Sequence, residues 1–395
     1  MLTEEQIEQI LYPYISRQAE FNMSVIRVIA DRLSRIADFD SLDTLERMAV
    51  MQSDIKIIND THKKYIKEQK KHIDDDFWWV VAFIYAEAYV YYDTHTPLKD
   101  NKAVNAISAA AIGQAQATLV KLLNNPVFVI RDLKNPNNLK AYNLEKTYRT
   151  VINEAYSYRN LSDELRDIAL KRTETQLFDS GIHYSIDNSS NSLESVKNAN
   201  TSVRFTVLDG IKNLINQVEE TMGKQFNADG LQLSAHMFPA PDHAPAQGHR
   251  FTFEEVDKMQ SAANFEDVDG NKYIGFERNI GEWNCRHYFM RVKLKSAPTY
   301  TQKELDKILE ENEKGYTDAN GKHYTLYQCT QIQRRYEREI RNAKEKYLYA
   351  KALNDKATMF NARNRVGALT TKYKQFSNAC GISAKLERIK VKDYK

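Results

Sequence analysis

Two short segments of the chain concentrate residue types that can carry chemistry. Residues 234–248 read SAHMFPAPDHAPAQG and residues 281–287 read GEWNCRH, and together they hold three of the nine histidines and one of the three cysteines. Proline removes a backbone donor and restricts the residue before it, so the Pro-rich run 239–245 is neither regular helix nor central strand. We expect two loops that bring imidazole, carboxylate, amide and thiol groups together.

These side chains admit three interpretations. The first is a structural zinc site, for which nitrogen and sulfur are suitable ligands, supplied by His236, His243, Cys285 and His287. The second is acid–base cleavage of a phosphodiester by two of the histidines, beside an arginine and an aspartate. The third is a set of hydrogen bonds that brace the loops of a small domain, made by Asp242, His243, Gln247, Asn284 and Arg286. We favour the third and expect no catalytic residue and no cofactor, with zinc as the alternative.

Motifs of several large enzyme classes are missing from the sequence. It contains no GxxxxGK(S/T) loop, no GxGxxG after a strand, no HExxH and no GxSxG. Their absence argues against an ATPase, a dinucleotide enzyme, a zincin and an α/β-hydrolase. Three adjacent acids, 74–76, precede an apolar run, a position in which carboxylates favour the N-terminal dipole of a helix more often than they hold a cation.

The two loop segments resemble a known family. Asp242-His243-Ala244 followed by Gln247-Gly248, and later Asn284-Cys285-Arg286-His287, are similar to motifs of phage minor capsid proteins of the minor capsid protein 2 type, relatives of the Mu F-like head morphogenesis proteins. Further similar stretches are 298–301, 321–325 and 330–341, and the resemblance covers roughly 145–395. Family members often carry Arg-Pro-Asp-His where this chain has Ala240-Pro241-Asp242-His243, so a basic contact is missing here.

The resemblance implies a minor structural protein of a tailed-phage head. Such proteins are low in copy number, are assembled in the host cytoplasm, and lie in the head interior or at the portal vertex. The implied partners are the portal or the major capsid protein and, without sequence preference, the packaged DNA. The alternative is a virion-carried nuclease or toxin-like enzyme that uses the cluster of His236, His243 and His287.

Charge is distributed unevenly along the 395 residues. The net charge is +3, but residues 331–395 hold 17 Lys and Arg against 6 Asp and Glu, which leaves −8 on the first 330 residues. A basic segment on a mildly acidic body indicates a polyanionic partner at one end. Three cysteines in so long a chain argue against a disulfide framework and suit a reducing compartment.

The basic segment begins with a stripe of cations at helical spacing. The candidate contacts to DNA phosphates or to a partner protein are Arg334, Arg335, Arg338, Arg341 and Lys344. Glutamates at 337, 339 and 345 allow ion pairs within the same helix, which would make it merely a stable exposed helix. Both interpretations stay open at this point.

The hydrophobic pattern predicts a mainly α fold with a small α+β module. Residues 1–224 form a helical body with loop breaks near 94–101, 124–142 and 185–202, and we expect helices over 3–36, 42–69, 77–92, 103–123, 143–158, 162–180 and 203–223. Residues 225–330 form the α+β module, with hairpin turns at 269–271 and 320–321. Residues 331–395 are a basic helical tail, broken near Gly367 and Gly381. We find no internal repeat.

Two features of the helices bear on partners. The most apolar run, 77–92, is shorter than the ~20 residues of a membrane helix and contains Glu87, so we expect a buried helix and no membrane partner. No secretory signal opens the sequence. The amphipathic helices 3–36 and 42–69 have apolar stripes but few caps between them, so part of that surface is predicted to dock on a partner such as the portal.

Overall fold

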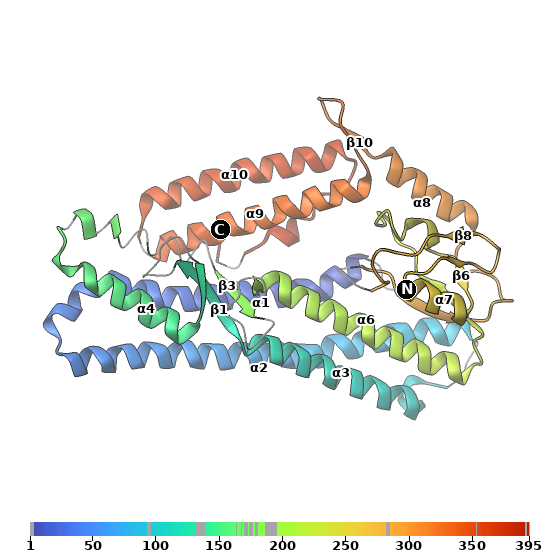
Figure 1. The fold of residues 1–395 in the computed structure, drawn as a ribbon, viewed down its shortest axis with the longest axis horizontal. Helices are drawn as coiled ribbons and strands as arrows, with labels where there is room; N and C mark the ends of the chain where they lie inside the picture. Colours follow the sequence, from blue (N-terminus) through green and yellow to red (C-terminus); the bar gives the residue numbers. More distant parts are fainter. Residues whose placement is uncertain are drawn as a thin grey trace.

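The computed structural model describes residues 4–391, 393 and 394, apart from 93–95, 132–138, 186–195, 282–284, 353 and most of 163–180. Its fold is mainly α with a small α+β module, as predicted from the sequence. Figure 1 shows an elongated molecule in which long helices run side by side, the α+β module lies at one end, and a pair of C-terminal helices covers one side.

Five helices whose bounds the structure describes form most of the helical body. These are α1 (Glu4–Ser34), α2 (Thr44–Tyr91), α3 (Lys102–Leu123), α4 (Leu144–Ser157) and α6 (Ala199–Gln225). α1 lies against α2 and α6, and its apolar stripe is buried in the main core through residues such as Leu11, Ile26 and Leu33. The stripe of α1 is therefore used within the chain. The predicted capping residue Thr3 lies outside the described residues.

α2 corrects the prediction of two separate helices over 42–69 and 77–92. It is continuous because no proline or glycine interrupts residues 44–91, and Asp43 closes its N-terminus in a capping box with Glu46. The three acids 74–76 therefore lie inside the helix and not at an N-terminus. One face of the run 77–92 is buried, as expected, but Trp78 and Trp79 are 36% and 46% exposed.

An antiparallel sheet corrects the prediction of an all-helical body. Its four strands are β1 (Pro126–Arg131), β2 (Leu139–Asn143), β3 (Ile182–Ser185) and β4 (Val196–Asn198), in the order β2-β1-β3-β4. The expected loop over 124–142 thus contains strands. Phe128 and Ile130 alternate inward, and Phe128 pairs with Ile182 of β3, which is distant in sequence, whereas Ile130 pairs with Lys140 of β2. Of the predicted helix 162–180, few residues are described, and those are helical apart from Ser162 at its start.

The α+β module contains the predicted hairpins. β5 (Gly230–Leu233) pairs with both β6 (Arg250–Phe251) and β9 (Phe289–Val292). α7 (Phe253–Gln260) precedes the hairpin of β7 (Phe265–Glu266) and β8 (Lys272–Tyr273), and α8 (Gln302–Lys314) precedes that of β10 (Tyr316–Thr317) and β11 (His323–Tyr324). A separate hydrophobic cluster fills the module.

The module also contains a repeat that the sequence prediction missed. Thr-x-x-Glu-(Val/Leu)-Asp-Lys opens both α7 at Thr252 and α8 at Thr301, and each threonine side chain accepts a hydrogen bond from the glutamate N–H three residues on. Asp-x-(Asp/Asn)-Gly-x-x-Tyr then forms each hairpin turn, and the tyrosine hydroxyl donates to the aspartate, Asp267 or Asp318. The two helices differ in length, which obscures the repeat in the sequence.

The C-terminal segment is a helical hairpin packed on the body. α9 (Leu326–Ala352) and α10 (Lys356–Ala379) lie side by side (Figure 1). The predicted break at Gly367 is wrong, since this exposed glycine lies within α10, whereas the break at Gly381 is confirmed by its φ of +67°. Leu348 and Tyr349 of α9 join the main core. The main core therefore contains residues from both sides of the predicted boundary at residue 224. The division into 1–224, 225–330 and 331–395 stays a prediction.

One described helix, α3, is long and apolar enough to cross a membrane. This is weak evidence, because the core helices of soluble proteins pass the same test, and one third of its most apolar window is buried inside the protein. Its inner face packs on α2 and α6, and its outer face carries mainly alanine.

Candidate functional site

The structure brings three of the predicted side chains together in the interior. The ligand atoms of His243, Cys285 and His287 all lie within 4.8 Å of one another, and all three residues are buried. His243 is 0% exposed and His287 is 2% exposed. Gln247 is buried beside them, so four residues of the two predicted loops form one cluster, which we call the His/Cys cluster.

Neighbouring elements hold the two loops in place. The first loop leaves β5 and makes a positive-φ turn at Phe238, a short 3-10 helix at Ala244–Ala246 and a second positive-φ turn at Gly248. Lys212 of α6 donates to the carbonyl oxygen of Gly281 at 2.7 Å, which holds the start of the second loop. The second loop then runs into β9, the neighbour of β5 in the sheet. The sheet therefore fixes the ends of both loops.

Hydrogen bonds fix the orientation of both imidazole rings. His243 Nε2 lies 2.9 Å from the carbonyl oxygen of Arg278, so this nitrogen carries a hydrogen, and Nδ1 faces Cys285 Sγ at 3.4 Å. Gln247 Oε1 accepts from the backbone N–H of His236 and lies 3.4 Å from His287 Nε2. His287 Nδ1 then also faces Cys285 Sγ, again at 3.4 Å.

An ion pair missed by the sequence analysis supports the first loop. Arg278 donates to both carboxylate oxygens of Asp242, at 2.5 and 2.8 Å. The same arginine presents its carbonyl oxygen to His243, so its backbone and side chain hold consecutive residues of the loop. Arg278 thus supplies a basic contact to Asp242.

The cluster shifts the pKa values of its members in different directions. Burial raises the pKa of the Cys285 thiol, but the hydrogen bond and charge of His243 outweigh burial and lower it. Burial lowers the pKa of His243, and Cys285 with the Arg278 carbonyl raises it above its ordinary value. Burial and the neighbouring cations hold the pKa of His287 well below its ordinary value. The pKa shifts of the thiol and of His243 therefore both favour the charged form, and the pKa shift of His287 favours the neutral form.

The remaining predicted loop residues lie around the cluster or outside the described chain. His236 is half-buried, with its ring centroid 4.3 Å from that of His287, and its Nδ1 lies 2.9 Å from the Met237 carbonyl oxygen. Asn284 is not among the described residues. Arg286 turns away from the cluster toward Glu8 of α1, 3.8 Å away.

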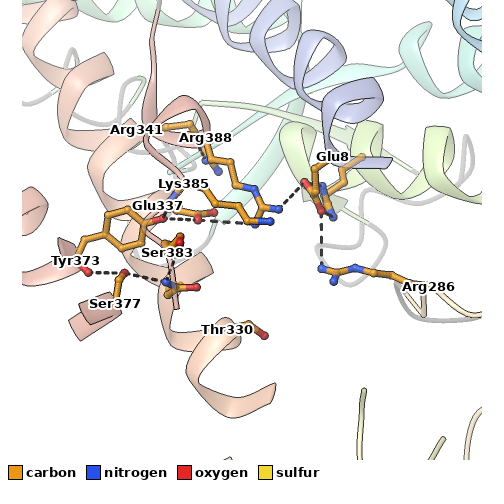
Figure 2. A network of polar contacts seen from close by, with 12 residues as sticks. Glu8, Arg286, Thr330, Glu337, Arg341, Tyr373, Ser377, Ser383, Lys385 and Arg388 are labelled. Atoms are coloured by element: carbon orange, nitrogen blue, oxygen red, sulfur yellow. Dashed lines mark hydrogen bonds and ion pairs between the residues drawn. The ribbon is translucent and has the colours of Figure 1, made fainter. Parts of the chain in front are cut away.

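Glu8 is the centre of a second polar site, shown in Figure 2. Its carboxylate accepts from Arg204 of α6 at 2.8 and 2.5 Å, and lies 3.7 Å from Arg388 near the C-terminus. Arg388 also lies 3.9 Å from Glu337, which accepts from Tyr373. This Glu8 network joins α1, α6, the second loop, α9 and α10, and no local signal in the sequence reveals it.

The predicted basic stripe does not share one environment. Arg341 donates to the carbonyl oxygen of Arg388 and Lys344 to that of Ile389, both at 2.6 Å. These two cations of α9 therefore hold the stretch of chain that follows α10. Arg335 pairs with Glu339 at 3.0 Å. Arg338 is exposed and Arg334 is half-buried. The stripe is therefore divided between the protein interior and the surface.

Two cavities among the described residues lie away from the His/Cys cluster. One is lined by α1 and the C-terminal segment, including Tyr12, Arg27 and Lys390. The other lies between α6, α7 and β9, beside Glu219 and Arg291. Neither includes a histidine or cysteine of the cluster.

Comparison with known proteins assigns the chain to a family. Neither the comparison with curated proteins nor the comparison with solved structures gives a match. The family model described as phage minor capsid protein 2 matches residues 2–378, which extends the similarity over the helical body as well as the two loops. The chain therefore belongs to the phage minor capsid protein 2 family.

Proposed function

We propose that the protein is a minor structural component of a tailed-phage head, bound at the portal or inner capsid wall, where α10 contacts the packaged DNA. Family membership supports the structural role. The observation that carries the DNA contact is the charge of α10. Its 24 residues include five Lys and Arg and no Asp or Glu. Such a surface attracts phosphates without reading base sequence.

The cations of α10 flank its outer face in two rows. Lys356, Arg363 and Lys374 lie along one side of the helix, and Arg365 and Lys372 along the other. All five are exposed. Between the rows the helix exposes small or uncharged residues, among them Asn364, Gly367 and Thr371. Figure 1 shows α10 on the outside of the molecule, with α9 between it and the body. This geometry suits a helix lying along a phosphate backbone.

A salt titration on a random-sequence duplex tests the proposal. Replacing Arg363, Arg365, Lys372 and Lys374 by Gln removes four cations and keeps good helix formers. Each phosphate contact contributes about 0.9 to the log–log salt slope, so the slope should fall by up to ~3.6. The matched control removes four exposed cations from α2: Lys63, Lys67, Lys70 and Lys71. Equal slopes for the wild type and the α10 variant would refute DNA contact through α10.

A nuclease that uses His236, His243 and His287 is the alternative function. It is less well supported, because His243 and His287 are buried and the two described cavities do not reach them. A general acid or base must come within hydrogen-bond distance of its substrate. We therefore propose a structural and not a catalytic role for the cluster.

A further inference from the structure

The His/Cys cluster has one hydrogen too few for its acceptors. The lone pairs of His243 Nδ1 and His287 Nδ1 both face Cys285 Sγ at 3.4 Å. A thiol has one hydrogen and can donate to only one of them. The second lone pair then faces sulfur without a hydrogen between them, inside a buried site where unpaired polar atoms are costly.

Changing the protonation states does not remove the mismatch. If His243 is doubly protonated beside a thiolate, the neutral His287 can donate through Nδ1 only by giving up the hydrogen on Nε2. Its Nε2 then faces Gln247 Oε1, which is an acceptor fixed by the His236 backbone N–H at 3.2 Å. Rotating the Gln247 amide by half a turn gives His287 Nε2 a donor. It also turns the NH₂ group toward the backbone N–H of His236, so that two donors face each other. With His287 neutral, each metal-free state keeps one mispaired contact, and protonating His287 as well would place two cations side by side in a buried site.

A bound cation satisfies every one of these atoms. Two imidazole nitrogens and a thiolate converge, and the opposite ring nitrogens donate to the Arg278 carbonyl and the Gln247 amide oxygen. Metal-binding histidines almost always have such a partner on the second nitrogen, because it fixes the tautomer and orients the ring.

A second group of metal-ligating side chains in the described part of the chain provides a contrast. His249, Asp267 and Asp269 also lie together. There, however, Asp267 accepts from the backbone N–H groups of Asp269 and Asn271 and from the hydroxyl of Tyr273, each at 2.9 Å. Its oxygens are satisfied without a cation, so we assign no metal there.

We infer that His243, Cys285 and His287 bind one zinc ion, which joins the first loop to the second. They supply three of the four ligands that zinc takes in structural sites. The ion links the loop after β5 to the loop before β9, and through Arg286 its position is connected to the Glu8 network. Metal binding replaces hydrogen-bond bracing alone as our interpretation of the cluster.

Metal analysis of the purified full-length protein tests the inference. We expect about one zinc ion per chain, either as purified or after the metal-free protein is reconstituted with zinc. With cobalt in place of zinc, we expect the near-ultraviolet absorption of a thiolate-to-cobalt charge transfer. Cys285→Ser should lose both signals, and the control Cys380→Ser, which replaces a buried cysteine elsewhere, should keep both.

A variant that leaves all three ligands in place separates metal binding from general damage to the fold. Gln247→Leu removes the partner of His287 Nε2, together with the acceptor of the His236 N–H, and should weaken zinc binding by about 10- to 100-fold. Wild-type protein that holds no zinc after reconstitution and gives no cobalt charge-transfer band would overturn the inference, whether or not the variants fold. Equal zinc affinity in wild type and Cys285→Ser would overturn it as well.

Discussion

Replacing Glu8 by Gln should destabilise the protein strongly at neutral pH. The carboxylate lies among Arg204, Arg286 and Arg388, and its side chain is 13% exposed. Burial raises the pKa of Glu8, but the three arginines outweigh burial and lower it from 4.5 to about 2. This lowering corresponds to about 3 kcal/mol of stability at pH 7. Removing one member of a buried ion network typically costs about 3–5 kcal/mol, which agrees in size.

The sign of the pH dependence follows from the lowered pKa. A carboxyl with a lower pKa in the folded state stabilises the fold above its unfolded pKa and loses that contribution as pH falls. The wild type should therefore lose the Glu8 contribution between about pH 4.5 and pH 2, and its advantage over Glu8→Gln should shrink over the same interval.

Glu345 is a matched comparison with the opposite sign. It is buried in α9, and burial raises its pKa to about 7, although Arg341 lowers it. A carboxyl with a raised pKa loses stability as pH rises from about 4.5 to about 7. Glu345→Gln should therefore stabilise the protein at pH 8, by up to about 3 kcal/mol, and have little effect at pH 4.5.

Urea denaturation of the wild type and both variants from pH 3 to pH 8 measures these effects. A third variant, Glu68→Gln, removes an exposed carboxylate 3.9 Å from Lys64 and should change stability by less than about 0.5 kcal/mol. If Glu8→Gln unfolds at the same urea concentration as Glu68→Gln at pH 7, the Glu8 carboxylate does not stabilise the fold through the three arginines, and the reasoning is refuted. A stabilising Glu8→Gln would refute it more strongly.

The repeated hairpins give two further predictions, each with its own control. Asp267→Asn should lower the free energy of unfolding, measured with urea, by about 2–3 kcal/mol, because this buried carboxylate accepts several hydrogen bonds and faces His249 at 2.7 Å. Asp318→Asn, in the more exposed copy, should lower it by about 1 kcal/mol or less. Gly315→Ala should lower the melting temperature clearly, since its φ is +44° and a Cβ would lie 2.0 Å from the Tyr324 carbonyl oxygen. Gly321→Ala, with φ +80° and no atom within 4 Å, should cost only about 1 kcal/mol; equal losses within either pair would contradict the prediction.

Local signals in the sequence predicted the features that depend on neighbouring residues. The Pro-rich run 239–245 is a loop, α3 and α6 lie where helical periodicity placed them, and the turns at Gly270 and Gly321 form hairpins. The zinc interpretation of the two loops grouped His236, His243, Cys285 and His287, and three of these four lie together. These features follow from backbone restriction, side-chain spacing and turn chemistry, all of which act over a few residues.

Features that depend on distant pairing were missed. β1 is a strand because Phe128 faces Ile182 in β3, and nothing near Phe128 specifies that partner. Arg278 was not recognised as the partner of Asp242, because the two are 36 residues apart and Arg278 lies in no motif. The sequence indicated that Arg341 and Lys344 are surface cations, whereas in the structure they donate to the carbonyl oxygens of Arg388 and Ile389. Sequence spacing describes one helix, whereas burial depends on what covers it.

The Glu8 network bears on the order in which the protein folds during synthesis. The ribosome releases Glu8 before its partners, which follow at positions 204, 286 and 388. Domains generally fold as they emerge, and contacts distant in sequence form slowly because a long loop must close first. The Glu8 carboxylate of α1 is therefore fully surrounded only after Arg388 has been synthesised. A nascent or prematurely terminated chain lacks Arg388. We expect α1 to pack less stably in such a chain, and the chain to be degraded before it can enter an assembling particle.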